Sequence, residues 1–494
     1  MPPLRSRLAF ACYALTFLVA TVGVRPTGDG TEYLVVARAI GRHGTPDIRL
    51  PNARWIRERE PHFRQLTAEL VHGIEAGARN PLPSVYRTPG GAYYSLHFWF
   101  FSLLAVPFLE LTELLGLSPV LALAWVNACG LCAAIAVLFR RSDRAGPALV
   151  ATVLLWLCGT TFYLAWTGPE VLTGATVLIA CLAAKSGRLG LAIAAGGLAA
   201  TQNPSAVFVL PFVVWTAWPL RRPLPLGEKL GVAGGVLLAA LPYLFFYSKF
   251  GVWSLIATFA TDLALISWER AWSLAFDLNE GMIVGIPGLL AAFVAVVVAV
   301  VVRASAPERP ALYREVGATL ALVVAMAVPT FSIHNWNSGN VVFIRYAYWL
   351  AMPLFALALE LSERLAERSR ILVAAGALAL QLCVVGLNGL WGERYNFVHH
   401  GSVAKLVLRH FPGAYNPVPE IFYERSLGWE WEPDKVDVVV WPYRGRPGKV
   451  MVRHGHRAVS KRICSDGSEI LSDSVRPASG GWTYLDAPFQ CRAR

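Results

Sequence analysis

The sequence predicts an all-α polytopic membrane protein of about eleven transmembrane helices, with juxtamembrane helices on its outer face and a small C-terminal domain of α/β or β-rich structure. The chain has 494 residues, of which 55% are hydrophobic and 15% charged, and its mean hydropathy is +0.48. Apolar runs near the roughly 20 residues that cross a bilayer recur from Leu8 to Leu390. A lipid-facing barrel would instead show alternation in segments of about ten residues, and none is visible.

The net charge of +12 does not indicate nucleic acid, because the arginines are spread through short loops and a tail. A membrane surface is the better partner. By the positive-inside rule the gaps that carry these charges face the cytoplasm. Their residues are Arg5 and Arg7; Arg140, Arg141 and Arg144; Lys185 and Arg188; Arg221, Arg222 and Lys229; Arg303, Arg309 and Arg314; and Arg364, Arg368 and Arg370.

The gaps between them then face outward, as does everything after Trp391. If the first span carries the chain outward and Arg140 is cytoplasmic, an odd number of crossings must lie between them. Two apolar runs occur there, so one of them does not cross the membrane. The run that starts at Phe98 has an apolar core of only about 12 residues and contains Pro107, so we expect Tyr93 to Leu117 to form a re-entrant or interfacial helix. Leu189 to Leu220 is interrupted at Asn203 and predicts two short helices in a hairpin.

The predicted domains follow from this topology. Residues 1–390 form the transmembrane domain, with outer loops at 25–117 and 249–281, and residues 391–494 form the C-terminal domain. The second loop carries Trp253, Trp268 and Trp272, which favours a helix at the lipid headgroups. The N-terminal apolar run is expected to be a retained anchor, because no clear cleavage site precedes Asp29.

Six of the eight cysteines lie in apolar runs, where they are expected to be small hydrophobic residues: Cys12, Cys129, Cys132, Cys158, Cys181 and Cys383. Cys464 and Cys491 lie in the polar tail. If the tail is outside the cytoplasm, a disulfide between them is the expected state.

Polar residues gather in four of the outward gaps. They are Asp29 and Glu32 after the first span; Tyr86, Arg87, Tyr93, Tyr94 and His97 at the entry to the re-entrant segment; Glu170 in TGPEV; and His334, Asn335, Trp336, Asn337 and Arg345 around the start of the tenth span. All four gaps lie on one side of the membrane, as a single outward-facing active cavity requires.

These residue types suit transfer of a sugar from a lipid phosphate. Asp29, with Glu32 beside it, is the predicted catalytic acid group, and Asp29 would take the proton of an acceptor hydroxyl. Arg345 would stabilise the charge on the departing phosphate. Each has a plainer interpretation: a solvated loop for the two acids, and an interfacial arginine that snorkels to headgroups for Arg345.

The remaining candidates are less specific. Glu170 would support a metal or orient the acceptor, or simply favour a helix N-terminus. His334 is as readily a loop histidine with no ligand. Asp262, Glu269 and Asp277 are expected on the solvated face of the interfacial helix. No zinc-type spacing, phosphate-cradling glycine loop or nucleophile elbow occurs, which disfavours a nucleotide-sugar or ATP enzyme.

Four segments resemble the GT-C superfamily of integral-membrane glycosyltransferases, which includes protein O-mannosyltransferases and aminoarabinose lipid A transferase. They are GDGTEYLVVARAIGRHG; YRTPGGAYYSLHFWFFSLLAVPFLELTELLG; FGVWSLIATFA with AFDLNEGMIVGIP; and HNWNSGNVVFIRYAYWLAMP. The resemblance implies that Asp29 is the catalytic base, Glu170 the second-loop acid and Arg345 the arginine of the last pattern. Thr88, Pro89, Gly90 and Gly91 stand where mannosyltransferases have His-Pro-Pro, which leaves donor and acceptor open.

The resemblance further implies an inverting transferase of a bacterial inner membrane. The charges of the loops predict a cytoplasmic N-terminus and a C-terminus on the other, periplasmic side. Its donor would be a polyprenyl-phosphate sugar and its acceptor a glycan, lipid or protein of the cell envelope. A divalent metal stays open, since the superfamily has metal-using and metal-free members. The alternatives are a transporter or flippase for a lipid-linked sugar, which would favour paired repeats and mid-membrane charges, and a non-catalytic scaffold whose tail binds an envelope partner.

Overall fold

The structure is a computed structural model of the chain. It describes residues 4–142, 144–218, 224–337, 343–388, 397–443, 446–453, 469–472, 475–487 and 489–492. The chain divides into two compact units. The first unit comprises Met1–Thr261, Ala291–Thr330 and Tyr348–Leu378; the second comprises Asp262–Leu290, Phe331–Ala347 and Ala379–Arg494.

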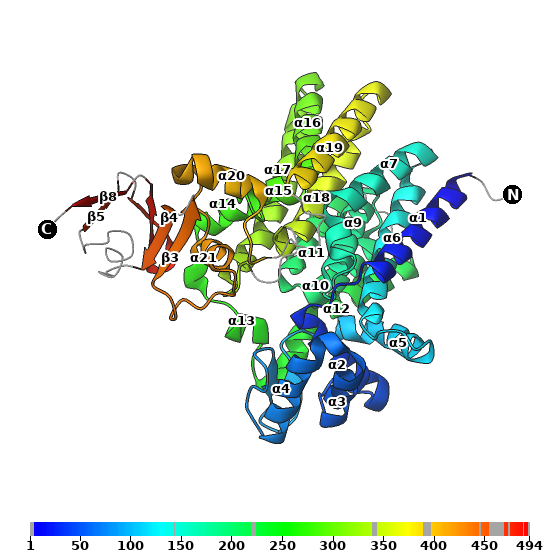
Figure 1. Ribbon diagram of the computed structural model, residues 1–494. Coiled ribbons are helices and arrows are strands. Elements are labelled where there is room, and N and C mark those ends of the chain that lie inside the picture. The colour runs from blue at the N-terminus through cyan, green and yellow to red at the C-terminus, as the bar shows by residue number, and fades with distance from the viewer. Residues whose placement is uncertain are drawn as a thin grey trace. The chain divides into compact units, whose positions relative to one another are not determined.

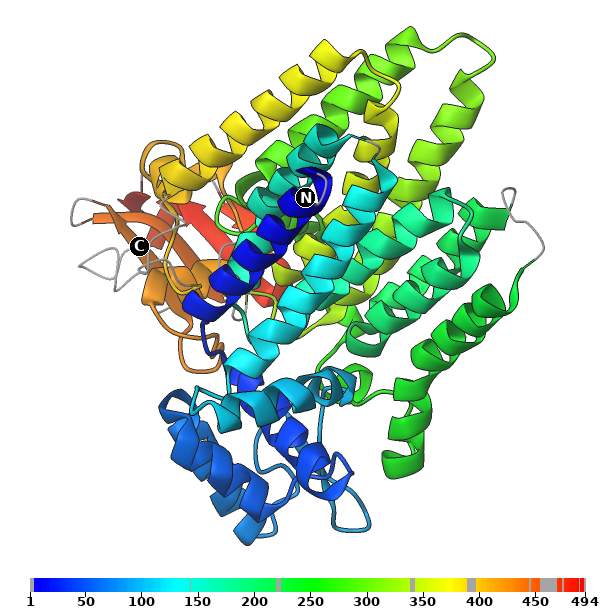
Figure 2. The same cartoon turned by 90° about the vertical axis from the view of Figure 1, so that its right-hand side faces the viewer.

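Among the residues that the structure describes, six helical segments are long and apolar enough to cross a bilayer, so the chain is a membrane protein. They are α1 (Leu4–Val22); α6 (Leu121–Arg141); α7 (Ala145–Leu155) continued by η2 (Trp156–Thr160) and α8 (Thr161–Tyr163); α12 (Leu226–Phe250); α17 (Arg309–Ala327) continued by η6 (Val328–Ser332); and α19 (Glu367–Asn388). In the first unit α1, drawn in blue, packs along α6, drawn in cyan (Figure 2).

Six candidate spans are fewer than the eleven predicted. Other apolar segments form shorter helices, namely α10 (Leu189–Gln202), η3 (Pro204–Phe208) with α11 (Val209–Ala217), and α16 (Pro287–Arg303). At about 1.5 Å of rise per residue, a 14-residue helix such as α10 falls short of the roughly 30 Å hydrocarbon core. The predicted hairpin is confirmed, because α10 ends before Asn203 and α11 packs back on it, with Val209 against Gly196.

Glycines allow α10 and α12 to approach each other closely. Gly190 and Gly197 of α10 face Gly231 and Gly235 of α12, and the last two are spaced as in the G-x-x-x-G pattern of membrane helix pairs. A Cβ at Gly231 would lie 2.7 Å from the carbonyl oxygen of Gly190. Helix packing in a membrane lacks a hydrophobic drive, so this backbone contact supplies van der Waals energy that larger side chains would prevent.

A buried lysine joins three helices of the first unit. Lys185 ends α9 (Glu170–Lys185), a helix that is buried along almost its whole length. Its ammonium group pairs with Glu315 of α17 and lies 2.5 Å from Glu360 of α18 (Arg345–Ser362). The lysine side chain is only 5% exposed, so this pairing offsets the cost of burying its charge.

A block of short helices follows α1. It contains α2 (Gly28–His43), α3 (Leu50–Arg59), η1 (Pro61–Phe63), α4 (Arg64–Glu75), the strands β1 (Val85–Arg87) and β2 (Tyr93–Ser95), and α5 (Phe100–Leu114). Figure 1 shows α2, α3, α4 and α5 gathered together. α5 has 15 residues and is not among the candidate spans. The predicted helix over Tyr93–Leu117 is too long at its start, because Tyr93–Ser95 pair with β1 as strand β2. The place of α5 at the membrane surface stays a prediction.

Arg38 links this block, because its guanidinium lies 2.7 Å from Glu113 of α5 and 4.0 Å from the ring centroid of Trp55 of α3. Burial of Arg38 therefore depends on an ion pair and a cation–π contact made by two different helices.

The second unit contains the predicted small C-terminal domain, and its sheet is antiparallel. Its strands follow the order β3–β4–β7–β6, beside a separate pair β5–β8. The bounds are β3 (Val438–Tyr443), β4 (Arg446–Arg453), β5 (Glu469–Ser472), β6 (Val475–Pro477), β7 (Trp482–Asp486) and β8 (Phe489–Arg492). The helical elements near it are α20 (Ser402–His410), η7 (Pro412–Ala414), α21 (Pro419–Leu427) and η8 (Ser479–Gly481).

Alternation along the strands builds the core of this domain. Val439 and Met451 are directly paired, and both pack with Leu408 of α20 and Phe422 of α21. The neighbouring Val438 packs in a second cluster on the other face of the sheet. Two segments from earlier in the chain complete the unit. The first of them, Asp262–Leu290, contains η5 (Leu263–Leu265), α14 (Trp268–Phe276) and α15 (Met282–Gly285), while α13 (Leu255–Phe259) belongs to the first unit.

The cysteine predictions have different outcomes. All six cysteines of the apolar runs lie on helices. Cys12, Cys158 and Cys181 are buried, but Cys129 and Cys383 are exposed. Exposed positions on apolar helices are compatible with a lipid-facing thiol. The predicted disulfide lies outside the described residues, because these do not include Cys464.

We predict that Gly235→Leu destabilises the first unit, because a Cβ at this position would overlap the backbone of Ile193. Overpacking of this kind costs about 1–3 kcal/mol. Thermal unfolding of the purified protein in detergent would measure the loss. Gly234→Leu is the matched control, since a Cβ at Gly234 meets nothing within 4 Å and gains the same helix propensity. Equal loss in both variants would contradict the proposed close contact.

Candidate functional site

The two predicted catalytic acids lie near the start of α2, where the chain leaves α1. The backbone amide of Arg25 donates to Ala165, 2.7 Å away, and that of Thr27 donates to the hydroxyl of Thr167 at 3.1 Å. Gly30 is required here, since a Cβ would lie 2.7 Å from the Thr167 hydroxyl and 2.9 Å from Phe63. The loop that leads to Glu170 is therefore packed against the acidic turn of α2.

Glu32 is buried and held by the β-hairpin. Its carboxyl group, 4% exposed as a residue, accepts a hydrogen bond of 2.9 Å from the hydroxyl of Ser95. Nδ1 of His97 is 3.5 Å from the same oxygen. Burial, reinforced by the charge of Asp29, raises the pKa of Glu32 to about 8, while hydrogen bonds with Ser84 and Ser95 oppose the rise. Glu32 therefore holds a proton at neutral pH, and Asp29 is the more accessible acid, being only half-buried.

The hairpin explains how the predicted aromatic and basic residues are presented. Arg87 pairs with Tyr93 across the strands, and the turn between them closes at Gly91, whose φ of 88° suits glycine. Arg87 is exposed and donates to the carbonyl of Gly77 at 3.1 Å. Tyr93 and Tyr94 are each 7% exposed. Tyr94 packs edge-on against Phe245 of α12, so its position supports the hairpin.

Glu170 starts α9 and is 5% exposed. Asn127 of α6 fixes the loop that precedes Glu170. The side-chain amide of Asn127 donates to the carbonyls of Trp166 at 3.2 Å and Gly168 at 2.8 Å. The Asn127 side-chain oxygen accepts from the amide of Leu172 at 3.0 Å. The predicted second acid is thus placed by a polar side chain from a candidate span, at a helix N-terminus that favours its negative charge.

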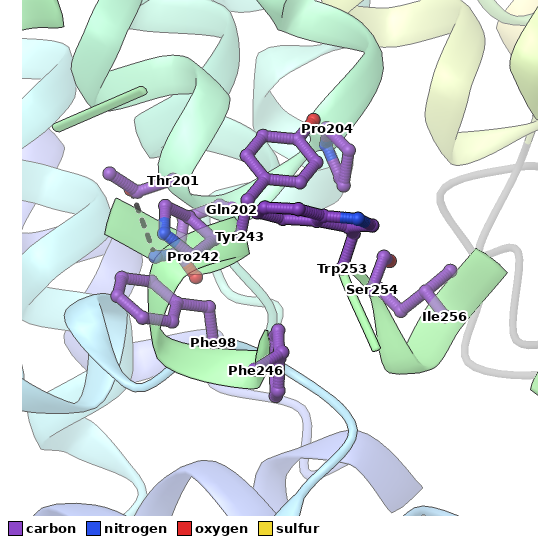
Figure 3. Close-up of a pocket in the computed structure, with 10 residues that line it drawn as sticks. All are labelled: Phe98, Thr201, Gln202, Pro204, Pro242, Tyr243, Phe246, Trp253, Ser254 and Ile256. Atoms are coloured by element: carbon purple, nitrogen blue, oxygen red, sulfur yellow. Dashed lines mark hydrogen bonds between the residues drawn. The ribbon is translucent and has the colours of Figure 1, made fainter. Parts of the chain in front are cut away.

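A small pocket lies beyond the hairpin in the first unit. Phe98, which follows His97, lines it together with Tyr243 and Phe246 of α12 and with Trp253 (Figure 3). Gln202 lies at the break between α10 and η3 and donates to the hydroxyl of Thr201 at 3.1 Å. The volume of about 20 Å³ suits one water molecule rather than a sugar.

The other predicted binding residues belong to the second unit. Arg345 is the first residue of α18, half-buried, with its guanidinium carbon 5.4 Å from the ring centroid of Tyr346. His334 and Asn335 are exposed, but Trp336 is 1% exposed and donates from its indole to the hydroxyl of Ser273 at 3.2 Å. Trp336 therefore packs in the interior. The meeting of Asp29 with Arg345 stays a prediction.

The second unit buries a group of charged side chains that the sequence patterns did not predict. Arg425 of α21 has a side chain with no exposed surface and lies 3.5 Å from the carboxylate of Glu280, which is equally buried. The same guanidinium donates to the side-chain oxygen of Asn337 at 3.0 Å and to the carbonyl of His399 at 2.7 Å. Three distant segments of the chain are therefore joined at one arginine.

Two glutamates of α21 complete this group. Glu420 accepts from the backbone amide of Asn337 at 2.8 Å, and Arg270 lies 3.8 Å from it. Glu424 accepts from the amide of Trp431 at 2.7 Å. Burial raises the pKa of Glu420 to about 8, helped by the charge of Glu424, and raises that of Glu424 to about 7. Both carboxyl groups therefore take up protons near neutral pH.

The prediction that Asp277 lies on a solvated face is wrong. Asp277 is 3% exposed, and its carboxylate accepts from the hydroxyl of Tyr415 at 3.0 Å and from the amide of Asn279 at 2.7 Å. Burial raises its pKa. Asp262 is exposed, as predicted, and Glu269 is intermediate. A sequence signal for the hidden group existed in PEIFYER, where two acids and an arginine are interleaved with large apolar residues.

Among the residues that the structure describes, no group of three or more His, Cys, Asp or Glu side chains is placed to hold a metal ion. No protein-family model matches the chain, and no curated protein matches it. The interpretation of the site thus rests on its own geometry and on the sequence patterns.

We predict that Glu32→Gln flattens the dependence of stability on pH. With a folded-state pKa of about 8 and an unfolded value near 4.5, Glu32 makes the folded chain bind more protons between these limits. Stability from this group is complete below pH 4.5 and falls as the pH rises toward 8. Unfolding temperatures measured across this range should decline less in the variant. An identical decline in both proteins would show that folding does not raise the pKa of Glu32.

We predict that Arg425→Leu destabilises the second unit by about 3–5 kcal/mol, because Glu280 would be left buried without its ion-pair partner. Thermal unfolding followed by tryptophan fluorescence would report the loss. Arg409→Leu on the exposed side of α20 is the control and should change stability little. An unfolding temperature unchanged by Arg425→Leu would contradict a structural role for the group.

Proposed function

We propose that this protein is a glycosyltransferase of the GT-C type, which moves a sugar from a polyprenyl-phosphate donor to a cell-envelope acceptor. In this proposal the reaction takes place on the periplasmic face of a bacterial inner membrane, with the N-terminus in the cytoplasm and the C-terminus in the periplasm. The orientation rests on the distribution of arginine and lysine between the loops.

One observation carries the proposal: two carboxyl groups near the start of α2 have different environments. Glu32 is buried, hydrogen-bonded to Ser95 and protonated at neutral pH. Asp29, one turn earlier and half-buried, is left as the acid that can act on a substrate. Two neighbouring acids in different environments are a common arrangement for acid–base chemistry.

In the proposed reaction Asp29 accepts the proton of the acceptor hydroxyl as its oxygen attacks the anomeric carbon. The bond between that carbon and the phosphate oxygen breaks, and the lipid phosphate leaves with the electron pair. Attack opposite the leaving group inverts the anomeric centre. Arg345 is proposed to stabilise the charge of the departing phosphate, and Glu170 to orient the acceptor. His97, held 3.5 Å from Glu32, would maintain the position of the acid pair.

We predict that Asp29→Asn lowers the rate of sugar transfer by about 10²–10⁴-fold, the usual contribution of a general base. Purified protein in proteoliposomes would be given a panel of synthetic polyprenyl-phosphate sugars with envelope acceptors, and release of polyprenyl phosphate would be measured. Glu58→Gln, an exposed acid on α3, is the matched control and should retain wild-type activity.

Transfer that persists undiminished in the Asp29→Asn protein would remove Asp29 from the role of base. A wild-type protein that cleaves no donor in the panel but moves intact lipid-linked sugar between leaflets would favour the transporter. Neither cleavage nor movement, with an envelope protein bound to the tail, would favour the scaffold.

A further inference from the structure

Helix α14 carries its large aromatic side chains on the outside. Trp268, Trp272 and Phe276 follow one another at intervals of four residues along one face, and they are 76%, 52% and 45% exposed. Their rings are in contact, with centroids 6.3 Å apart for the first pair and 4.3 Å for the second. We call these three residues the aromatic stripe.

The opposite face of α14 holds an arginine inside the second unit. Arg270 is 5% exposed and donates to the carbonyl of Phe331 at 2.7 Å and to that of Ile333 at 2.5 Å. Its guanidinium carbon lies 5.2 Å from the ring centroid of Trp336. Turning the helix would break these charge-assisted bonds, so the outward direction of the aromatic stripe is fixed by its inner face.

The core of the second unit does bury tryptophan side chains elsewhere. Trp336 and Trp482 are each 1% exposed in its core. A helix that buries arginine and exposes tryptophan is inverted relative to a helix on a water-soluble surface. The inversion is favourable only if the stripe faces a medium less polar than water.

The apolar surface continues before α14 and carries little charge. Leu263 is 77% and Ile266 is 40% exposed. The carboxylate of Asp262 accepts from the amide of Ala264 at 2.9 Å, and that of Glu269 accepts from the amide of Ser479 at 3.0 Å. This face therefore does not attract anionic partners. Arg270 is the one basic residue between Asp262 and Phe276, and it is buried.

We propose that the aromatic stripe, with Leu263 and Ile266, is inserted into the headgroup boundary of the bilayer, so that α14 lies along the membrane surface. Neighbouring apolar segments favour a lipid surface as the partner of the aromatic stripe. The same unit contains Ala379–Asn388, the end of candidate span α19, and the apolar helix α16 begins 11 residues after Phe276. Tryptophan prefers this boundary because it has an apolar ring and a polar N–H group. The proposal does not depend on the proposed enzymatic function.

The test places the photoreactive residue p-benzoylphenylalanine at Trp268 or at Trp272 of the full-length protein in phosphatidylcholine nanodiscs. After irradiation, mass spectrometry would identify what each position has captured. The expected result is a phosphatidylcholine adduct at both positions. The matched control has the same residue at Trp429, which is 49% exposed in the same unit but outside α14, and no lipid adduct above background is expected there.

Other outcomes would overturn the proposal. A covalent dimer captured from both positions would show that a second copy covers the aromatic stripe. Cross-links within the chain, or no adduct at either position, would show that the stripe faces protein or water. Equal lipid capture at Trp429 would show that labelling follows exposure alone rather than insertion of α14.

Discussion

The constraint on which this structure depends is the cost of removing carboxyl groups from water. An unpaired ionised carboxylate in a low-dielectric interior is so unfavourable that the group must be protonated, hydrogen-bonded or paired with a cation. Glu32 satisfies this requirement with a proton and with Ser95, whereas Glu280 satisfies it with Arg425. Each unit is organised around such a solution, because the partners come from segments far apart in the chain.

The same requirement explains how the buried charged side chains of α21 hold the second unit together. These are Glu420, Glu424 and Arg425, with Glu280 as the partner of Arg425. Asn337 is fixed on both its backbone and its side chain by Glu420 and Arg425, a few residues before the start of α18. Burial raises the pKa of Glu420 to about 8 and that of Glu424 to about 7, so both carboxyl groups take up protons near neutral pH. The excess of carboxyl groups over guanidinium groups in this interior can therefore be accommodated without a matching cation for each.

The solvent around a helix decides which side chains it buries, and the α10–α12 pair and α14 show two different outcomes. Between α10 and α12 small residues allow backbone contact, because lipid provides no hydrophobic drive for association. In α14 the large aromatic side chains face outward and Arg270 faces inward, where backbone carbonyls replace its water. In both cases the polarity of the surroundings, rather than the polarity of a side chain alone, decides which residues are buried.

The sequence by itself determined the helical membrane class, the short helix before α6, the break at Asn203 and the presence of Asp29 and Glu32 directly after the first apolar helix. These depend on the length of apolar runs and on neighbouring residues, which are local properties. Only the tertiary structure decided which helical segments of the described residues have the length of a span, that Glu32 meets Ser95, and that Asp277 is buried. Burial and proton affinity depend on partners that are far apart in the chain, such as Glu280 and Arg425, and local patterns carry no information about such pairs.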